Sequence, residues 1–502
     1  MTAPEIPNLT RVVVRGAGLA GAGFALAQVL TLSFYLVLAR LATPDDFGVF
    51  AAGSILVGIG TLFAEAGLMS ALIQRRDRIE EAASTAVAAT LVGGLALSLL
   101  ALALAPLVGL YFERTRVTQV AAAMSGWLLL QAATVVPDAL MQRRFSFVRR
   151  LAVEPAGVVA FGITAVVACS HGLGVWGLVL GTYALGVAQV ALAWGLVGWR
   201  PSARLVSYEM WRELLAFGRH VMSSEFIRRV AAELDAALVG RFIGTAPLGQ
   251  YRYARRFAIQ PLAGVVNIAS YVLLPAFAQL SGERERDRFR PAFLRALRWT
   301  STIALPTSFA FLPLGEPVAV LLLGERWREA GQALSALCAY SAGGAVVSVA
   351  SEGLKAWGRP DFLPRIHLFG AILAAALMLA LLPVGLVGIA AAVSIASAAV
   401  AVYALRAVGR AVDIPLRGML AEIWPPFVAA ALSAATLYPA ERLLVHASER
   451  GTLVGLALLA AEALLGAALY LALLAAAAPA SARELLAVTS AAWRRLRRSG
   501  GR

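Results

Sequence analysis

Residues 217–254 read FGRHVMSSEFIRRVAAELDAALVGRFIGTAPLGQYRYA, an apolar run of membrane-spanning length that is interrupted by charges. At 100° per residue, five of these charges fall within an arc of about 160°, opposite an apolar face. Exposed to lipid, they would cost roughly 12 to 17 kcal/mol. The stretch therefore predicts a helix whose ionic face lines water or protein inside a membrane protein. The five residues are Glu225, Arg228, Arg229, Glu233 and Asp235.

Length and composition indicate a polytopic helical membrane protein. The 502 residues are 60% hydrophobic, the mean hydropathy is +0.76, and apolar runs of about 20 residues recur from end to end. The net charge of +15 does not indicate nucleic-acid binding, because the basic residues lie in short runs between the apolar segments. Cys169 and Cys338 lie in apolar runs, so we expect neither a disulfide framework nor a metal site.

The apolar runs predict about fourteen membrane-spanning helices. We expect a six-helix bundle in residues 1–200, a second one in 217–410 and two additional helices in 411–480. An interfacial linker in 201–216 and a basic tail in 481–502 complete the map. Most of the 44 basic residues lie in loops on one side of this map, which places both termini in the cytoplasm.

The two predicted bundles repeat one another. Arg40–Phe50 (RLATPDDFGVF) matches Arg241–Tyr251 (RFIGTAPLGQY), keeping the arginine, a hydrophobic-Gly pair and the final aromatic residue. A weaker echo pairs Gly174–Gly177 with Gly385–Gly388. Six helices is an even number, so the two halves run in the same sense. This arrangement predicts a pseudo-twofold axis along the membrane normal and a cleft between the halves, as in transporters built from parallel repeats.

Several short motifs accompany the repeat. They are Leu38–Gly48, Glu65–Leu68, Ala71–Arg76, Ala139–Arg143, Gly174–Trp176, Trp199–Pro201, Asp235–Gly244, Leu248–Tyr251, Leu274–Ala276 and Leu323–Trp327. In this combination, over roughly residues 10–410, the chain resembles Wzx-type polysaccharide flippases of the multidrug/oligosaccharidyl-lipid/polysaccharide (MOP) exporter superfamily. The second copy of the Asp45-Asp46 turn lacks the acids, and residues 411–480 match no motif.

This resemblance implies a bilobed, all-α transporter in a bacterial inner membrane. Such proteins move undecaprenyl-diphosphate-linked oligosaccharide units from the cytoplasmic to the periplasmic leaflet for O-antigen, capsule or exopolysaccharide synthesis. Membrane lipids, a polysaccharide polymerase and chain-length proteins are the expected partners, and we expect no nucleic acid and no cofactor. The sugars, the pathway and the oligomeric state stay open.

Arginine chemistry fits a diphosphate substrate independently of the resemblance. A diphosphate carries at least two negative charges, and arginine presents a planar fork of donors that stays charged in a low-dielectric cavity. After the first charged helix, three arginines follow at spacings i, i+3 and i+4 on one face of the next helix. The candidate substrate-binding residues are Arg228, Arg229, Arg252, Arg255 and Arg256. Alternatively, these arginines only pair with nearby acids and brace the helices.

Carboxylates near these arginines are candidates for coupling transport to an ion gradient. Asp235 and Glu233 follow Arg228 and Arg229 at helical spacing. A bound diphosphate would compete for the arginines and free the acids to take up H⁺ or Na⁺. Glu65 is the candidate from the first half of the chain. Bracing of helices is the alternative for each acid, and it stays open whether transport is coupled to an ion at all.

Two other classes of function fit parts of the pattern. An exporter of the same superfamily for another substrate, a peptidoglycan lipid precursor or a drug, would share the fold, although the arginines would repel a cationic drug. A membrane-embedded polysaccharide polymerase or ligase usually needs a large outer loop. The predicted outer loops are short, and the sequence shows no nucleotide-binding, metal or catalytic motif. We therefore expect a transporter and not an enzyme.

Overall fold

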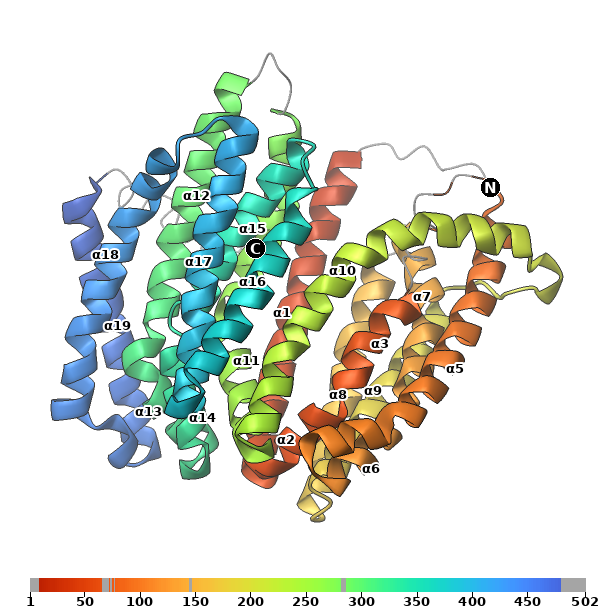
Figure 1. The fold of residues 1–502 in the computed structure, drawn as a ribbon, viewed down its shortest axis with the longest axis horizontal. Coiled ribbons are helices and arrows are strands. Elements are labelled where there is room, and N and C mark those ends of the chain that lie inside the picture. The colour runs from red at the N-terminus through yellow and green to blue at the C-terminus, as the bar shows by residue number, and fades with distance from the viewer. Residues whose placement is uncertain are drawn as a thin grey trace, which may run out of the picture. The chain divides into compact units, whose positions relative to one another are not determined.

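A computed structural model describes residues 9–65, 72, 75, 77–143, 147–280 and 286–479, with side chains for all of these except 9–22, 24–25, 62–65, 147–151, 216–228, 231–232, 264–272, 275 and 286. Within these ranges the chain forms helices joined by short turns and contains no strand. It divides into two compact units, Met1–Gly249 and Gln250–Arg502. Figure 1 shows the helices of each unit. The predicted all-α membrane architecture is confirmed.

The first unit is built from long helices connected by turns of a few residues. In chain order they are α1 (Leu9–Leu41), α2 (Pro44–Gly53), α3 (Ile55–Glu65), α5 (Ile79–Phe112), α6 (Thr115–Met124), α7 (Trp127–Arg143), α8 (Phe147–Ser170), α9 (Val175–Leu196) and α10 (Tyr208–Phe242). One buried cluster joins Val87 of α5, Leu140 of α7 and Met210 of α10. α10 runs without a break from the predicted surface linker into the predicted charged span.

The turn between α1 and α2 is fixed by the first copy of the sequence repeat. Thr43 caps α2, and Asp46 completes the capping box by accepting from the Thr43 backbone N–H at 3.0 Å. Asp46 also accepts from the backbone N–H of Val175 at 3.2 Å, which ties α2 to the start of α9. Asp45 pairs with Arg114 at 3.1 Å, next to the start of α6. The two acids of this turn therefore hold three helices of the first unit together.

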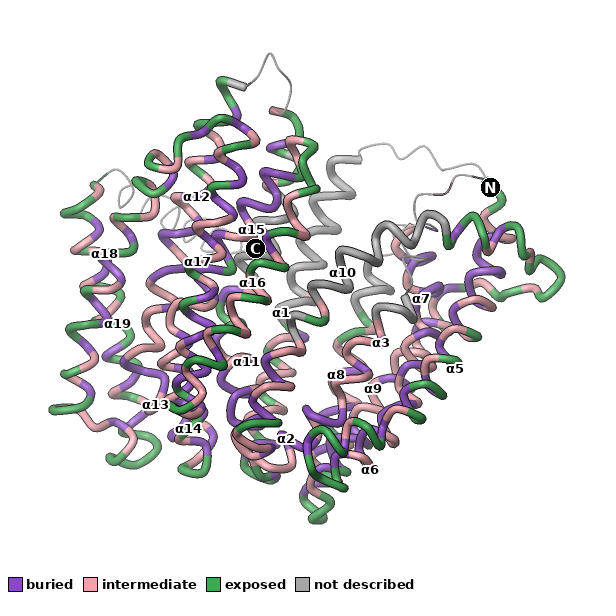
Figure 2. Tube along the Cα trace, viewed as in Figure 1, coloured by how far each residue is buried: buried purple, intermediate pink, exposed green. Residues whose placement is uncertain are grey.

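The second unit contains most of α11 (Thr245–Ala278), whose first five residues belong to the first unit. The other helices are α12 (Arg286–Phe309), α13 (Phe311–Leu323), α14 (Arg328–Ala336), α15 (Tyr340–Ala356), α16 (Phe362–Ala380), α17 (Leu386–Val412), α18 (Leu416–Ala440) and α19 (Thr452–Ala477). Phe277, Phe289 and Phe293 form the aromatic centre of a core that α15 and α17 complete. Figure 2 shows buried stretches along α12, α15 and α17.

The two units share local features at positions that the repeat pairs. Gly174 precedes α9 with φ +50°, and Gly385 precedes α17 with φ +77°. Glycine suits both turns because other residues rarely adopt a positive φ. In each unit an interrupted pair of helices lies one helix further back in the chain, α6 and α7 before α8 in the first and α14 and α15 before α16 in the second. The local structure thus agrees with the predicted repeat.

The described helices account for most of the predicted membrane spans. Eight are long and apolar enough to cross a membrane, and three bent pairs raise the number to eleven. The predicted number of fourteen is therefore not confirmed. α10 and α11, with 35 and 34 residues, are also long enough to cross a membrane, and parts of both lie outside the residues whose side chains are described. In α16, 11% of the most apolar stretch is buried within the protein, against 50% in α17, so α16 has the more exposed surface.

Candidate functional site

The acids Glu233 and Asp235 of α10 face protein. Asp235 is buried, with 7% of its surface exposed, and accepts from the backbone N–H of Ala236 at 2.8 Å. Glu233 is half-buried, and its carboxylate lies against Gly58 of α3, where a Cβ would be 2.9 Å from Oε1. This packing agrees with the prediction that the ionic face lines water or protein. The predicted Arg229 is half-buried on the same helix, whereas the side chains of Arg228, Glu225 and Glu65 lie outside the described residues.

Arg252, Arg255 and Arg256 lie together on α11, and all three are half-buried. The guanidinium of Arg255 donates to the Tyr340 hydroxyl, with Nη2 at 3.2 Å and Nε at 3.3 Å, and lies 5.6 Å from the ring centroid. Tyr340 is the first residue of α15. The phenol of Tyr340 is a neutral partner that orients the guanidinium of Arg255.

The start of α11 is anchored in the second unit by residues that alternate with the arginines. Gln250 donates to the carbonyl of Arg326 at 2.7 Å and accepts from the backbone N–H of Ala330 at 3.0 Å. Tyr253 is buried against Trp327, with ring centroids 4.2 Å apart. These contacts fix the rotation of α11, and therefore fix which side presents the arginines.

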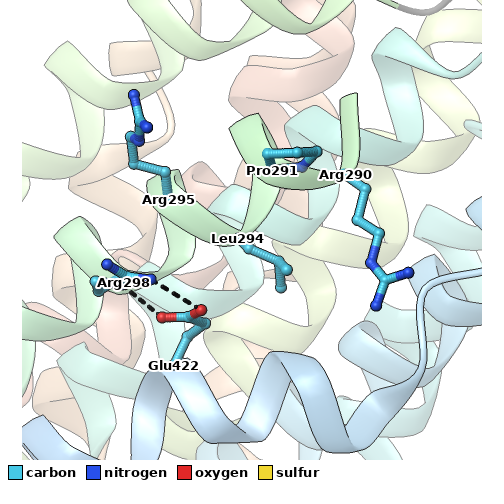
Figure 3. A pocket seen from close by; sticks show the side chains of 6 residues that line it. All are labelled: Arg290, Pro291, Leu294, Arg295, Arg298 and Glu422. Atoms are coloured by element: carbon cyan, nitrogen blue, oxygen red, sulfur yellow. Dashed lines mark hydrogen bonds and ion pairs between the residues drawn. The ribbon is translucent and has the colours of Figure 1, made fainter. Parts of the chain in front are cut away.

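A second cationic region lies in a pocket of about 280 Å³ between α12 and α18. Figure 3 shows Arg298 directed at Glu422, with Nε–Oε2 and Nη2–Oε1 distances of 2.5 and 3.0 Å. Arg290 and Arg295 also line this pocket, and both are exposed. The lining thus holds three arginines and one glutamate, so the pocket carries a net positive charge and suits an anion. It was not predicted as a site, although the sequence shows the basic run that supplies its arginines.

Comparison with known proteins relates this arrangement to a family. The family model described as polysaccharide biosynthesis protein matches residues 37–332, more than half of the chain. The chain belongs to this polysaccharide biosynthesis family. The match begins near the end of α1 and ends in α14, so it includes α10, α11 and all the predicted site residues. Of the residues that line the α12–α18 pocket, only those of α12 lie within the matched range, because α18 begins at Leu416.

Named relatives of this chain are proteins of polysaccharide biosynthesis. It is 28% identical over 306 residues to the succinoglycan biosynthesis transport protein ExoT of Rhizobium meliloti, a match that spans 60% of each chain. It is 24% identical over 365 residues to the lipopolysaccharide biosynthesis protein WzxC of Escherichia coli, covering 70% of this chain and 72% of that protein. These names bear out the predicted resemblance to Wzx-type flippases.

The fold is that of a transporter superfamily. The structure of the lipid II flippase MurJ superposes with a TM-score of 0.72 at 14% identity, over 91% of this chain and 98% of MurJ. An inward-facing MATE-family transporter of the MOP superfamily gives a TM-score of 0.61 at 16% identity, over 77% and 98% of the two chains. This chain therefore has a MOP-type fold, and the proteins that it resembles are transporters and flippases, not enzymes.

Two of the sequence motifs on which the resemblance to Wzx-type flippases rests have structural roles in this protein. Trp327 ends the Leu323–Trp327 motif and is fully buried beneath α11. Asp45 and Asp46 of the Leu38–Gly48 motif hold helix ends together, as described above. Trp327 thus packs against α11, and the two aspartates join helices of the first unit. The arginines of α11 and the ionic residues of α10 are the remaining candidates for contact with substrate.

Proposed function

We propose that this protein translocates undecaprenyl-diphosphate-linked oligosaccharide repeat units across the cytoplasmic membrane for surface polysaccharide synthesis. The observation that carries the proposal is the set of three half-buried arginines on α11, a long helix of a MOP-type fold. Family membership and the names of the relatives support a polysaccharide-linked substrate.

The proposed mechanism follows from the electrostatics of a diphosphate in a membrane. Desolvating two negative charges is costly unless cations replace the lost water. Arg252, Arg255 and Arg256, with Arg228 and Arg229 of α10, would supply that counter-charge through forked donors. Tyr340 holds the guanidinium of Arg255 in place through hydrogen bonds and a cation–π contact. Alternating access would then expose the arginines first to the cytoplasm and then to the periplasm.

In the same proposal, acids of α10 link the movement to a cation gradient. Asp235 is buried and Glu233 is half-buried in the protein, so uptake of H⁺ or Na⁺ would change the balance of charge around them strongly. Glu65 would contribute from α3. A substrate that draws the arginines away from these acids raises their affinity for a cation, which couples the two ligands.

Orientation and partners belong to the proposal as well. We place the chain in the bacterial inner membrane with both termini in the cytoplasm, since the basic loops lie on one predicted side. A polysaccharide polymerase and chain-length proteins would act on the translocated units.

A second candidate substrate is a lipid-linked peptidoglycan precursor. The superposition with the lipid II flippase MurJ favours it, because that fold covers 91% of the chain. Both substrates carry a diphosphate on a polyprenyl lipid, so the arginine argument applies to either. The sugar part would distinguish them.

A reconstituted flipping assay tests the proposal. Purified protein in proteoliposomes should move undecaprenyl-diphosphate-linked oligosaccharide between leaflets, and Arg252→Ala, Arg255→Ala and Arg256→Ala should each slow it by about tenfold or more. Arg417→Ala, a basic residue of α18 outside this set, is the matched control. Equal rates in all of these variants would refute the arginine site. Movement of lipid II alone would favour the second candidate, and movement of neither would reject both.

Coupling is tested in the same vesicles. With an imposed H⁺ or Na⁺ gradient, Asp235→Asn and Glu233→Gln should lose the dependence of flipping on the gradient. If flipping by the unaltered protein ignores every gradient, the protein is an uncoupled facilitator.

A further inference from the structure

Two glutamates face one another inside the last pair of helices. Glu441 begins a π-helical turn, Glu441–Val445, that follows α18, and Glu462 lies in the middle of α19. Each has only 6% of its surface exposed. α18 and α19 lie side by side in the second unit (Figure 1). A bond from the Ser433 hydroxyl to the Gly466 carbonyl, at 2.9 Å, joins the two helices. Both carboxyl groups are therefore enclosed by a packed helix pair.

Hydrogen-bond donors do not satisfy this pair. Glu441 Oε1 accepts from the backbone N–H of Ala447 at 3.0 Å. Among the described residues no donor reaches Glu441 Oε2 or either carboxylate oxygen of Glu462. The carboxyl group of Glu462 lies beside that of Glu441. Such a carboxyl–carboxyl contact is a hydrogen bond only when one of the two groups carries a proton.

Within the described part of the chain, no basic side chain hydrogen-bonds to either glutamate. Leu314, Leu321, Ala447 and Leu459 form a buried apolar cluster where α13, α19 and the turn after α18 meet. Apart from Glu462, the described part of α19 carries no charged residue. Two carboxylates in such a site would repel one another and lose their hydration.

The charged groups around Glu441 belong to a neighbouring cleft of about 670 Å³. Arg328 of α14 pairs with Glu316 of α13 and with Glu325. Arg442 lies 3.8 Å from Glu316, and its guanidinium is 4.7 Å from the Tyr438 ring centroid. The other ionisable residues that line the cleft are His446 and Glu449. The cleft arginines are thus committed to Glu316 and Glu325, while Glu441 lines the cleft and also reaches Glu462.

We propose that Glu441 and Glu462 form a binding site for a single proton, shared between the two carboxyl groups and exchanged with the cleft through Glu441. One proton converts the repulsive contact into a short hydrogen bond and leaves a single negative charge, which the Ala447 N–H helps to hold. The site lies beyond the family match, which ends at residue 332. It does not rest on the proposed function.

A proton fits this site better than a metal ion. Hard cations such as Na⁺ or Ca²⁺ take about six or more oxygen ligands in proteins. Here one of the four carboxylate oxygens already accepts an N–H, and the adjoining cluster is apolar. A proton needs only the two oxygens that face each other.

Infrared difference spectroscopy on the full chain in lipid nanodiscs tests the site directly. The carbonyl stretch of a protonated carboxylic acid should persist above roughly pH 4 to 5, where exposed glutamates have ionised, and should disappear on further alkalinisation. Glu462→Gln and Glu441→Gln should both abolish this band, because the amide N–H₂ donates to the remaining carboxylate without a proton. Glu449→Gln, at an exposed position of the same cleft, should leave it unchanged. A band that survives in both pair variants, or its absence from the unaltered protein, overturns the proposal.

Thermal stability gives a second, independent readout. The apparent Tm of the unaltered protein should fall as the pH rises and the proton leaves, by on the order of 2 to 4 °C or more, while that of Glu462→Gln should stay level. Replacing NaCl by choline chloride should have no effect. Stabilisation by Na⁺ at high pH would instead identify a metal-ion site. Neither experiment measures flipping, so their failure is distinct from failure of the proposed function.

Discussion

Gly48 of α2 and Gly249 of α11 lie so close together that neither position has room for a side chain. A Cβ on Gly48 would be 1.6 Å from the carbonyl oxygen of Thr245, and a Cβ on Gly249 would be 1.9 Å from that of Pro44. The two glycines are equivalent positions of the sequence repeat. The two copies of the repeat therefore pack directly on one another, backbone against backbone, within the first unit.

This contact predicts that alanine is not tolerated at either glycine. Gly48→Ala or Gly249→Ala must push the two helices apart and should cost at least about 1 to 3 kcal/mol. Thermal melts of detergent-purified protein should show a lower Tm for both. Gly93→Ala on α5, where a Cβ meets nothing within 4 Å, is the matched control and should be neutral or stabilising. Unchanged melting of Gly48→Ala would contradict the close packing.

The pair Arg298–Glu422 should couple α12 to α18. Each single change, Arg298→Ala or Glu422→Ala, should destabilise the protein by about 1 to 3 kcal/mol, since it leaves a partly buried charge without its partner. The double variant should cost less than the sum of the two single changes. A double-mutant cycle of unfolding free energies measures this coupling. Strict additivity would show that the bidentate contact contributes nothing.

Removing Glu422 should also make the α12–α18 pocket more attractive to anions. Glu422→Gln retains the shape of the side chain and frees the charge of Arg298 beside Arg290 and Arg295. Native mass spectrometry should then detect more bound anionic lipid than for the unaltered protein. Equal lipid retention would argue against an anion-binding character of this pocket.

An acid-sensitive contact joins the residues before α5 to the start of α10. Arg75 donates to Glu213 at 2.7 Å and, with Arg78, lowers the pKa of this exposed carboxyl below its ordinary value. A lowered pKa means that the contact stabilises the fold at neutral pH and that this contribution is lost as the pH falls through the lowered pKa. Proteolysis near residues 75–78 should therefore rise under acid conditions in the unaltered protein. The Glu213→Gln variant should be cleaved at neutral pH as readily as the unaltered protein is in acid. High salt should also increase cleavage of the unaltered protein, because it screens the contact between Glu213 and the arginines.

The predicted topology is testable with reporter fusions. A reporter that is active only in the periplasm should give signal after Leu110, His171 or Pro383, and none after Arg150 or Arg290. Leu110 is near the end of α5, and His171 and Pro383 lie in the turns before α9 and α17. The reverse pattern would invert the map and move both termini to the periplasm.

Much of this protein was predictable because apolar runs, basic loops and a repeated turn are local properties of the sequence. Membrane helices are recognised from about 20 apolar residues, and the ionic stripe of α10 follows from helical periodicity. The repeat likewise indicated where equivalent glycines and turns would lie. The number of spans was harder to predict, because α10 is a membrane-length helix that carries many charges, and α12 with α13 is a bent pair of helices.

Contacts between distant segments were decided only by the tertiary structure. No spacing in the sequence relates Tyr340 to Arg255, Glu422 to Arg298 or Glu462 to Glu441, since each pair lies on different helices whose mutual rotation is set by side-chain packing. In particular, Glu462 reads in the sequence as a single charge in an apolar helix. Only the packing of α19 against the turn after α18 buries it beside a second carboxyl group, where the loss of hydration gives it chemistry of its own.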